Sequence, residues 1–116
     1  MRCAVAESGH LLGRKWAIAI LEEIALGKFE GFNQFLRKAK MLTPRSLSVD
    51  LRKLENQGVI AKKTVGGRSA YTLTMKGEDL HKVVLDLKRL NVKWGAVPEK
   101  CMTSSCTECG YCSGQE

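Results

Sequence analysis

The sequence predicts a mainly α-helical fold with a small β-hairpin, which is an α+β arrangement. Three observations predict it: apolar residues recur at helical spacing in the first half, two β-rich runs flank a glycine pair, and a long helical segment follows. At 116 residues the chain has room for one domain with a modest core. No second globular domain fits within this length.

The first two expected helices are short and apolar. Residues Ala4–Leu12 form a mostly apolar segment that Gly13 interrupts. Residues 15–26 are apolar almost all round, which is typical of a buried helix. Glu22 and Glu23 lie within this second segment, and we expect them on a solvated charged face.

Two amphipathic helices follow before the hairpin. Residues 32–39 form the shorter of them, with Lys38 on its outward side. The next helix has clear boundaries: Thr43 is a good N-cap, and Pro44 suits the first helical position, where a missing N–H would be unpaired anyway. Gly58 suits the end of this helix.

This capped helix has two different faces. At about 100° per residue, the core-facing side carries Leu47, Leu51 and Leu54. The opposite side can face only solvent or a ligand. It carries Arg45, Val49, Arg52 and Asn56, flanked by Ser48 and Lys53.

A hairpin and a long helix complete the expected fold. Residues 59–65 and 69–73 are β-rich and meet at a turn of Gly66, Gly67 and Arg68, since glycine tolerates the positive φ of tight turns. Thr74 then caps a helix of about 20 residues. Along it, a 3-4-3-4 spacing typical of one helix packing along another is formed by Leu80, Val83, Leu87, Leu90 and Trp94.

Counted from residues 15–26, three helices followed by a two-stranded wing match the winged helix-turn-helix order, in which the third helix, here the capped one, enters the DNA major groove. The charge agrees with this interpretation, because 19 Lys and Arg against 12 Asp and Glu give a net charge of +7. The arginines and valine suit base edges, the lysine suits phosphate, and the wing arginine suits a minor groove. The predicted DNA-binding residues are Thr43, Pro44, Arg45, Ser46, Ser48, Val49, Arg52, Lys53 and Arg68.

The chain resembles the HxlR-type winged-helix transcriptional regulators, which are relatives of the MarR group. The resemblance covers residues 3–94, and its motifs are Cys3 with the following helix, L-L-G-R-K-W (11–16), F-N-Q-F-L-R (32–37), L-T-P-R-S-L-S-V-D-L-R-K-L-E-N-Q-G-V-I (42–60) and Y-T-L-T-M-K-G (71–77). It implies a homodimer formed by the N-terminal and C-terminal helices, with the third helix and wing of each subunit on double-stranded DNA. It also implies a repressor.

The resemblance makes Cys3 a candidate redox-sensing residue, because a cysteine near the N-terminus senses electrophiles or oxidants in some relatives. From its residue type alone, Cys3 fits a small buried hydrophobe equally well. The chain departs from the family pattern in two ways: Ala4 rather than proline follows Cys3, and a tail with four cysteines extends beyond the end of many relatives.

The tail spacing is C-x4-C-x2-C-x2-C, formed by Cys101, Cys106, Cys109 and Cys112. Thiolates this close together suit zinc or an iron–sulfur cluster, although the spacing matches no complete cluster pattern. Disulfides and free thiols remain alternatives. We therefore expect a DNA-binding and dimerisation domain over residues 1–97 and a cysteine-rich, metal-binding tail over residues 98–116, which would make the regulator responsive to redox state or metal.

Other functional classes fit less well. The sequence has no glycine-rich phosphate loop and no histidine pair at ligand spacing, so we expect no enzyme activity. It has neither a membrane span nor a signal peptide, which predicts a cytoplasmic protein. The alternative function is a winged-helix protein-interaction or redox module in a larger assembly, with the cysteine tail as its metal or iron–sulfur site.

Overall fold

The computed structural model describes residues 3–39, 41–95 and 98–102, and its element order confirms the expected α+β fold class. A single two-stranded antiparallel sheet accompanies the helices in the described ranges. The elements are α1 (Ala4–Leu12), α2 (Lys15–Ala25), α3 (Phe32–Lys38), α4 (Pro44–Asn56), β1 (Ile60–Val65), β2 (Arg68–Leu73), α5 (Met75–Lys93) and the 3-10 helix η1 (Glu99–Met102).

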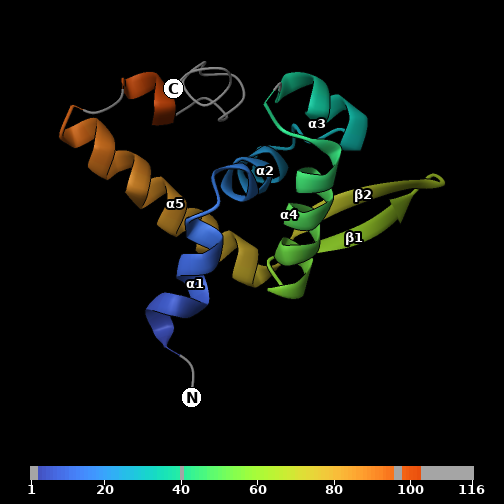
Figure 1. Ribbon diagram of the computed structural model, residues 1–116, viewed down its shortest axis with the longest axis horizontal. Coiled ribbons are helices and arrows are strands. Elements are labelled where there is room, and N and C mark those ends of the chain that lie inside the picture. The colour runs from blue at the N-terminus through green and yellow to red at the C-terminus, as the bar shows by residue number, and fades with distance from the viewer. Residues whose placement is uncertain (1–2, 40, 96–97, 103–116) are drawn as a thin grey trace.

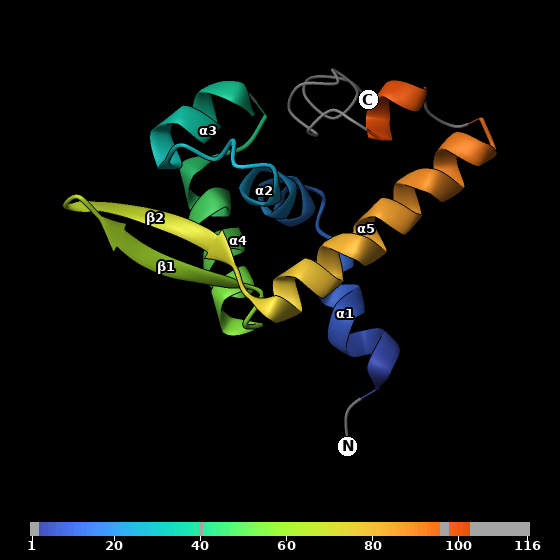
Figure 2. The same ribbon diagram turned by 180° about the vertical axis from the view of Figure 1, so that it is seen from behind.

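Helix α2 lies at the centre of the molecule, and the other elements surround it (Figure 1). It packs against α1, α4, α5 and β2. The hairpin projects to one side of the helical body, while α1 and the far end of α5 lie toward the other side, as both views show (Figures 1 and 2). The hairpin and the far end of α5 thus lie on opposite sides of the molecule.

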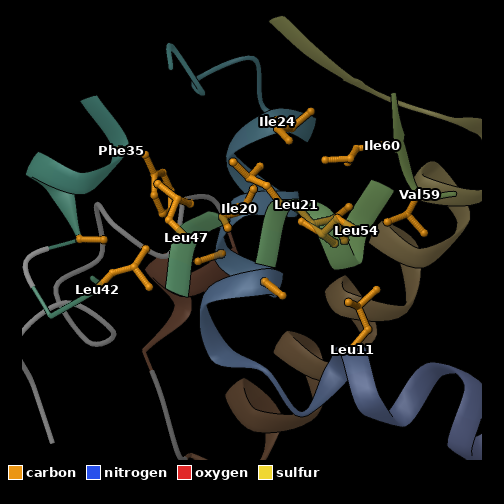
Figure 3. Packing of buried hydrophobic residues seen from close by; sticks show 14 of the residues in the cluster. Leu11, Ile20, Leu21, Ile24, Phe35, Leu42, Leu47, Leu54, Val59 and Ile60 are labelled. Atoms are coloured by element: carbon orange, nitrogen blue, oxygen red, sulfur yellow. The ribbon is translucent and has the colours of Figure 1, made fainter. Parts of the chain in front are cut away.

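The core forms where α2, α3 and α4 meet (Figure 3). Its largest fully buried apolar side chains include Ile20 and Leu21 of α2, Phe35 of α3, and Leu47 and Leu54 of α4. Their spacing follows from the apolar periodicity of each helix, because residues three and four positions apart share one helix face. This packing fixes α4 with its leucines inward and its polar side outward.

The hairpin has a shorter turn than the sequence predicted. Gly66 and Gly67 alone form the turn, with φ of 58° and 79°, and Arg68 begins β2 paired with Val65. Positive φ at both central residues is the geometry of a type I′ turn, which follows the twist of the two strands. Placing Arg68 in the turn was therefore wrong, although it remains the first residue after the turn.

The expectation that Glu22 and Glu23 lie on a solvated face is wrong. Both side chains are buried, at 1 % and 0 % relative exposure. The Lys88 ammonium of α5 pairs with the Glu22 carboxylate, and the Lys38 ammonium of α3 donates to Glu23 Oε2 over 3.2 Å. Adjacent glutamates in α2 therefore connect the central helix to two other helices.

Helix α5 begins as predicted and leaves an apolar strip uncovered. Thr74 caps it, with its hydroxyl oxygen accepting from the Gly77 N–H over 3.1 Å. Four of the residues with the predicted 3-4-3-4 spacing, which we name the α5 seam, are exposed: Val83, Leu87, Leu90 and Trp94. In the described part of the chain, no helix is both long enough and apolar enough to span a membrane.

Candidate nucleic-acid interface

Helix α4 starts at the predicted cap. The Thr43 hydroxyl oxygen accepts from the Ser46 N–H over 3.1 Å, and the hydroxyl donates to Ser46 Oγ over 3.0 Å. Pro44 occupies the first turn, where it removes a donor that would otherwise lack an intrahelical partner. Thr43, Pro44 and Ser46 are therefore placed together at the start of α4, where Thr43 and Ser46 form the cap.

The outer side of α4 carries most of the predicted DNA-binding residues. Arg45, Ser48, Arg52 and Lys53 are exposed, and Val49 is half-buried beside them. Their positions on one side of a regular helix agree with the helical periodicity of the sequence. Contact of these residues with bases or phosphates stays a prediction.

Asp50, the single carboxylate within residues 43–54, is directed away from this outer side. Its side chain is only 3 % exposed, and the Arg14 guanidinium donates to Asp50 Oδ1 over 2.6 Å. This pair holds α4 to the connection between α1 and α2. It also neutralises the one negative charge that would otherwise oppose phosphate binding at the middle of α4.

Sequence reasoning missed these internal ion pairs. Lys38 was expected to point outward, yet its side chain is 30 % exposed and reaches the buried Glu23 of α2. The available signal was the position of Glu23 in a segment that is apolar almost all round, because a carboxylate there needs a partner when it is buried. The pair fixes α3, which precedes α4, against the central helix.

The wing adds further positive charge beside α4. Lys62 and Lys63 of β1 are exposed, opposite Tyr71 and Ala70 in the strand register. At the body end of the hairpin, the Tyr71 ring contacts that of Phe29 edge-on, with centroids 5.9 Å apart. The two lysines were not among the predicted site residues, although their position in the first β-rich run indicated them. The Arg68 side chain lies outside the described part of the structure.

Cys3 is an exposed thiol at the N-cap of α1. The backbone N–H groups of Ala6 and, less strongly, Val5 lower the pKa of this thiol from its ordinary value. A lowered pKa increases the thiolate fraction, and the thiolate is the reactive form. Because the thiol is exposed, the alternative of a small buried hydrophobe is wrong. A redox-sensing role stays a prediction.

The cysteine tail falls almost entirely outside the described residues. Cys106, Cys109 and Cys112 lie outside them, while Cys101 is half-buried in η1, with its N–H donating to the Pro98 carbonyl over 3.1 Å. Within residues 3–39, 41–95 and 98–102 no cluster of three candidate metal ligands occurs. A zinc or iron–sulfur site at these four cysteines, and the division between residues 1–97 and 98–116, stay predictions.

The helices, the capped α4 and the hairpin together define a winged helix-turn-helix protein. Comparison with known sequences agrees, because the HxlR-like helix-turn-helix family matches residues 11–99. The chain belongs to this family, as its motifs indicated.

Similar proteins are named as regulators. The uncharacterized HTH-type transcriptional regulator YdeP of Bacillus subtilis (strain 168) is 34 % identical over 96 residues, covering 80 % of this chain and 71 % of that protein. An uncharacterized HTH-type transcriptional regulator of Methanothermobacter thermautotrophicus is 31 % identical over 96 residues, covering 80 % of this chain and 70 % of the relative.

A solved structure shares the fold. The reduced form of the transcriptional regulator YodB from B. subtilis superimposes with a TM-score of 0.63 at 24 % sequence identity. The likeness covers 80 % of this chain and 94 % of that one. It supports the winged-helix architecture.

Proposed function

We propose that this transcriptional regulator of the HxlR type binds double-stranded DNA as a homodimer, with α4 of each subunit in a major groove and the hairpin beside it. The observation that carries the proposal is the charge distribution on α4. Arg45, Arg52 and Lys53 are exposed; of the two carboxylates of α4, Asp50 is buried and paired with Arg14, and Glu55 is exposed in the last turn. A helix with this distribution attracts phosphate and presents donors to base edges.

The side chains on α4 divide into two roles under this proposal. Arg45 and Arg52 read guanine edges through their paired donors, and Val49 meets a thymine methyl group. Lys53 holds the DNA backbone as a point charge and carries no sequence information. Lys62 and Lys63 extend the positive surface along the hairpin.

We expect Arg52→Ala to weaken binding to a selected operator by about 1–3 kcal/mol and to relax selectivity at one base position. Lys53→Ala should weaken operator and random duplex to a similar degree and reduce the dependence of affinity on salt. Fluorescence anisotropy with both duplexes at several salt concentrations measures these effects. Arg89→Ala is the matched control, because Arg89 is an exposed arginine of α5 paired with Asp86.

Lys53→Ala is expected to weaken operator and random DNA equally. If Arg52→Ala also weakens both equally, the assignment of Arg52 to base reading is wrong. A loss of similar size from Arg89→Ala would contradict the location of the interface, since it would indicate a general effect of net charge.

The α5 seam supports the homodimer. Val83, Leu87 and Leu90 are 44 %, 41 % and 52 % exposed, and Trp94 is 76 % exposed, along one helix. A contiguous apolar strip of this kind is a common dimerisation surface, and a two-fold interface uses the same strip on both subunits. The operator is then pseudo-palindromic, with half-sites about one helical turn (~34–36 Å) or a multiple apart. Repression, and a response to redox state or metal, stay predictions from the sequence.

A further inference from the structure

The end of α4 and the start of α5 are joined by three hydrogen bonds. Three consecutive carbonyl oxygens follow α4, those of Gln57, Gly58 and Val59, and each receives a donor from the first turn of α5 or its cap. Lys76 Nζ donates to the Gln57 oxygen over 2.8 Å, and the Thr74 hydroxyl donates to the Gly58 oxygen over 2.5 Å. The Thr74 N–H donates to the Val59 oxygen over 3.1 Å. Figure 2 shows α5 beginning beside the end of α4.

Thr74 performs two tasks with one hydroxyl group. Its oxygen accepts from the Gly77 N–H, which caps α5, and its hydrogen goes to the Gly58 carbonyl. The cap of one helix and the end of the other therefore share a single side chain. A rotation of α5 relative to α4 would break the bond to Gly58, because the cap bond moves with α5.

Gly77 lets the first turn of α5 lie close to the chain that follows α4. A Cβ atom at this position would lie 2.0 Å from the Val59 carbonyl oxygen and 3.0 Å from its carbon, so the backbones approach more closely than any side chain allows. Gly77 itself is buried. We name the contacts of Thr74, Lys76 and Gly77 with residues 57–59 the α4–α5 junction.

We infer that the α4–α5 junction sets the half-site spacing that the protein selects in DNA, with Thr74, Lys76 and Gly77 as positioning residues. This inference rests on the proposed function. Helix α4 carries the side chains proposed to contact bases, and α5 carries the seam proposed to form the dimer. The junction therefore fixes the angle between the helix on DNA and the helix at the two-fold axis. With that angle fixed, the two α4 helices are held at one separation, and a spacing that differs by one base pair requires the junction to deform.

Lys76 serves the same purpose. Its ammonium group donates to a carbonyl at the end of α4, where a cation is also favoured by the negative end of the helix dipole. Its effect on DNA binding is therefore expected to depend on half-site spacing, whereas a phosphate contact acts at every spacing.

The test compares a series of duplexes in which two copies of a selected half-site are separated by different numbers of base pairs. We expect the unaltered protein to prefer one spacing. Thr74→Val and Lys76→Met should reduce the affinity ratio between the best spacing and its one-base-pair neighbours by roughly two- to tenfold, the factor that one hydrogen bond provides. Affinity for a single half-site should remain unchanged.

Two further variants complete the test. Thr74→Ser retains the hydroxyl and should restore the spacing preference. Lys82→Met removes the same charge from the same helix, and since the Lys82 ammonium is exposed and pairs with Asp79, it should leave the preference intact. Thermal unfolding of each variant establishes that the folded protein is compared.

Sharp spacing preference in both Thr74→Val and Lys76→Met would overturn the inference while leaving the proposed function intact. Equal losses on single half-sites and full operators would also overturn it, because the junction would then only stabilise the reading face. Failure of the unaltered protein to bind any duplex would refute the proposed function, and it would be seen before any variant is compared.

Discussion

Replacing Lys88 with methionine is expected to lower the free energy of unfolding by about 3–5 kcal/mol, which is the cost of breaking a buried ion pair by removing one partner. The Lys88 ammonium pairs with the Glu22 carboxylate, and the two side chains are only 9 % and 1 % exposed. Methionine keeps the length and apolar stem of lysine, so the packing of α5 on α2 changes little. The loss arises because the Glu22 carboxylate stays buried without its ammonium partner.

Urea unfolding at fixed protein concentration measures this effect, because a shifted midpoint with an unchanged slope reports stability alone. Lys82→Met provides the matched control, since the Lys82–Asp79 pair spans 3.6 Å on the surface and should contribute less than about 1 kcal/mol. Combining Glu22→Leu with Lys88→Met should recover most of the lost stability, because an apolar pair replaces the ionic one. Similar midpoints for Lys88→Met and Lys82→Met would contradict the buried pair.

Replacing Leu87 with lysine is expected to convert the proposed dimer to monomer and to weaken operator binding by about 100-fold or more, the lower end of the gain that two linked binding sites provide. Leu87 lies in the middle of the α5 seam and is 41 % exposed. A two-fold interface repeats every substitution, so two ammonium groups would have to be desolvated in one apolar contact. The isolated fold should tolerate lysine, because the seam is already exposed in the single chain.

Sedimentation equilibrium measures the mass, and anisotropy with full operators and single half-sites measures binding. Met75→Lys is the control, since Met75 is 84 % exposed in the first turn of α5 but lies off the seam. We expect it to stay dimeric. A Leu87→Lys protein that remains dimeric would place the interface elsewhere, and a monomeric unaltered protein would remove the basis for a pseudo-palindromic operator.

Local signals predicted much of the fold and the orientation of α4. The Thr43 cap, Pro44 and the leucine spacing all lie within one segment, and their physical effects act over a few residues. The glycine pair of the hairpin is also a local signal, although Arg68 was predicted to lie in the turn as well. Elements whose boundaries depend on neighbouring residues were therefore predicted within a few positions.

Long-range contacts explain what sequence reasoning missed. Glu22 and Glu23 look like surface residues when charge alone is considered, and only the packing of α5 and α3 on α2 reveals Lys88 and Lys38 as their partners. Asp50 likewise acquires its role from Arg14 in a different part of the chain.

The α4–α5 junction was also beyond sequence reasoning. Its acceptors are backbone carbonyls, which every residue possesses, so no residue type marks Gln57, Gly58 and Val59 as partners of Thr74 and Lys76. The hairpin brings these segments together, and only the folded chain displays the contact.

The dependence of duplex affinity on salt tests the central claim most directly. A protein that neutralises DNA phosphates releases counterions, whereas a protein-interaction module does not bind the duplex and releases none. With about 6–10 phosphate contacts per complex, operator affinity should fall by about 10³–10⁵ between ~50 and ~200 mM salt. A linear decrease of log affinity with log salt, with a shallower slope for Lys53→Ala, is the predicted result. Absence of duplex binding at ~50 mM salt, or an affinity that does not change with salt, would contradict the account and favour an interaction module.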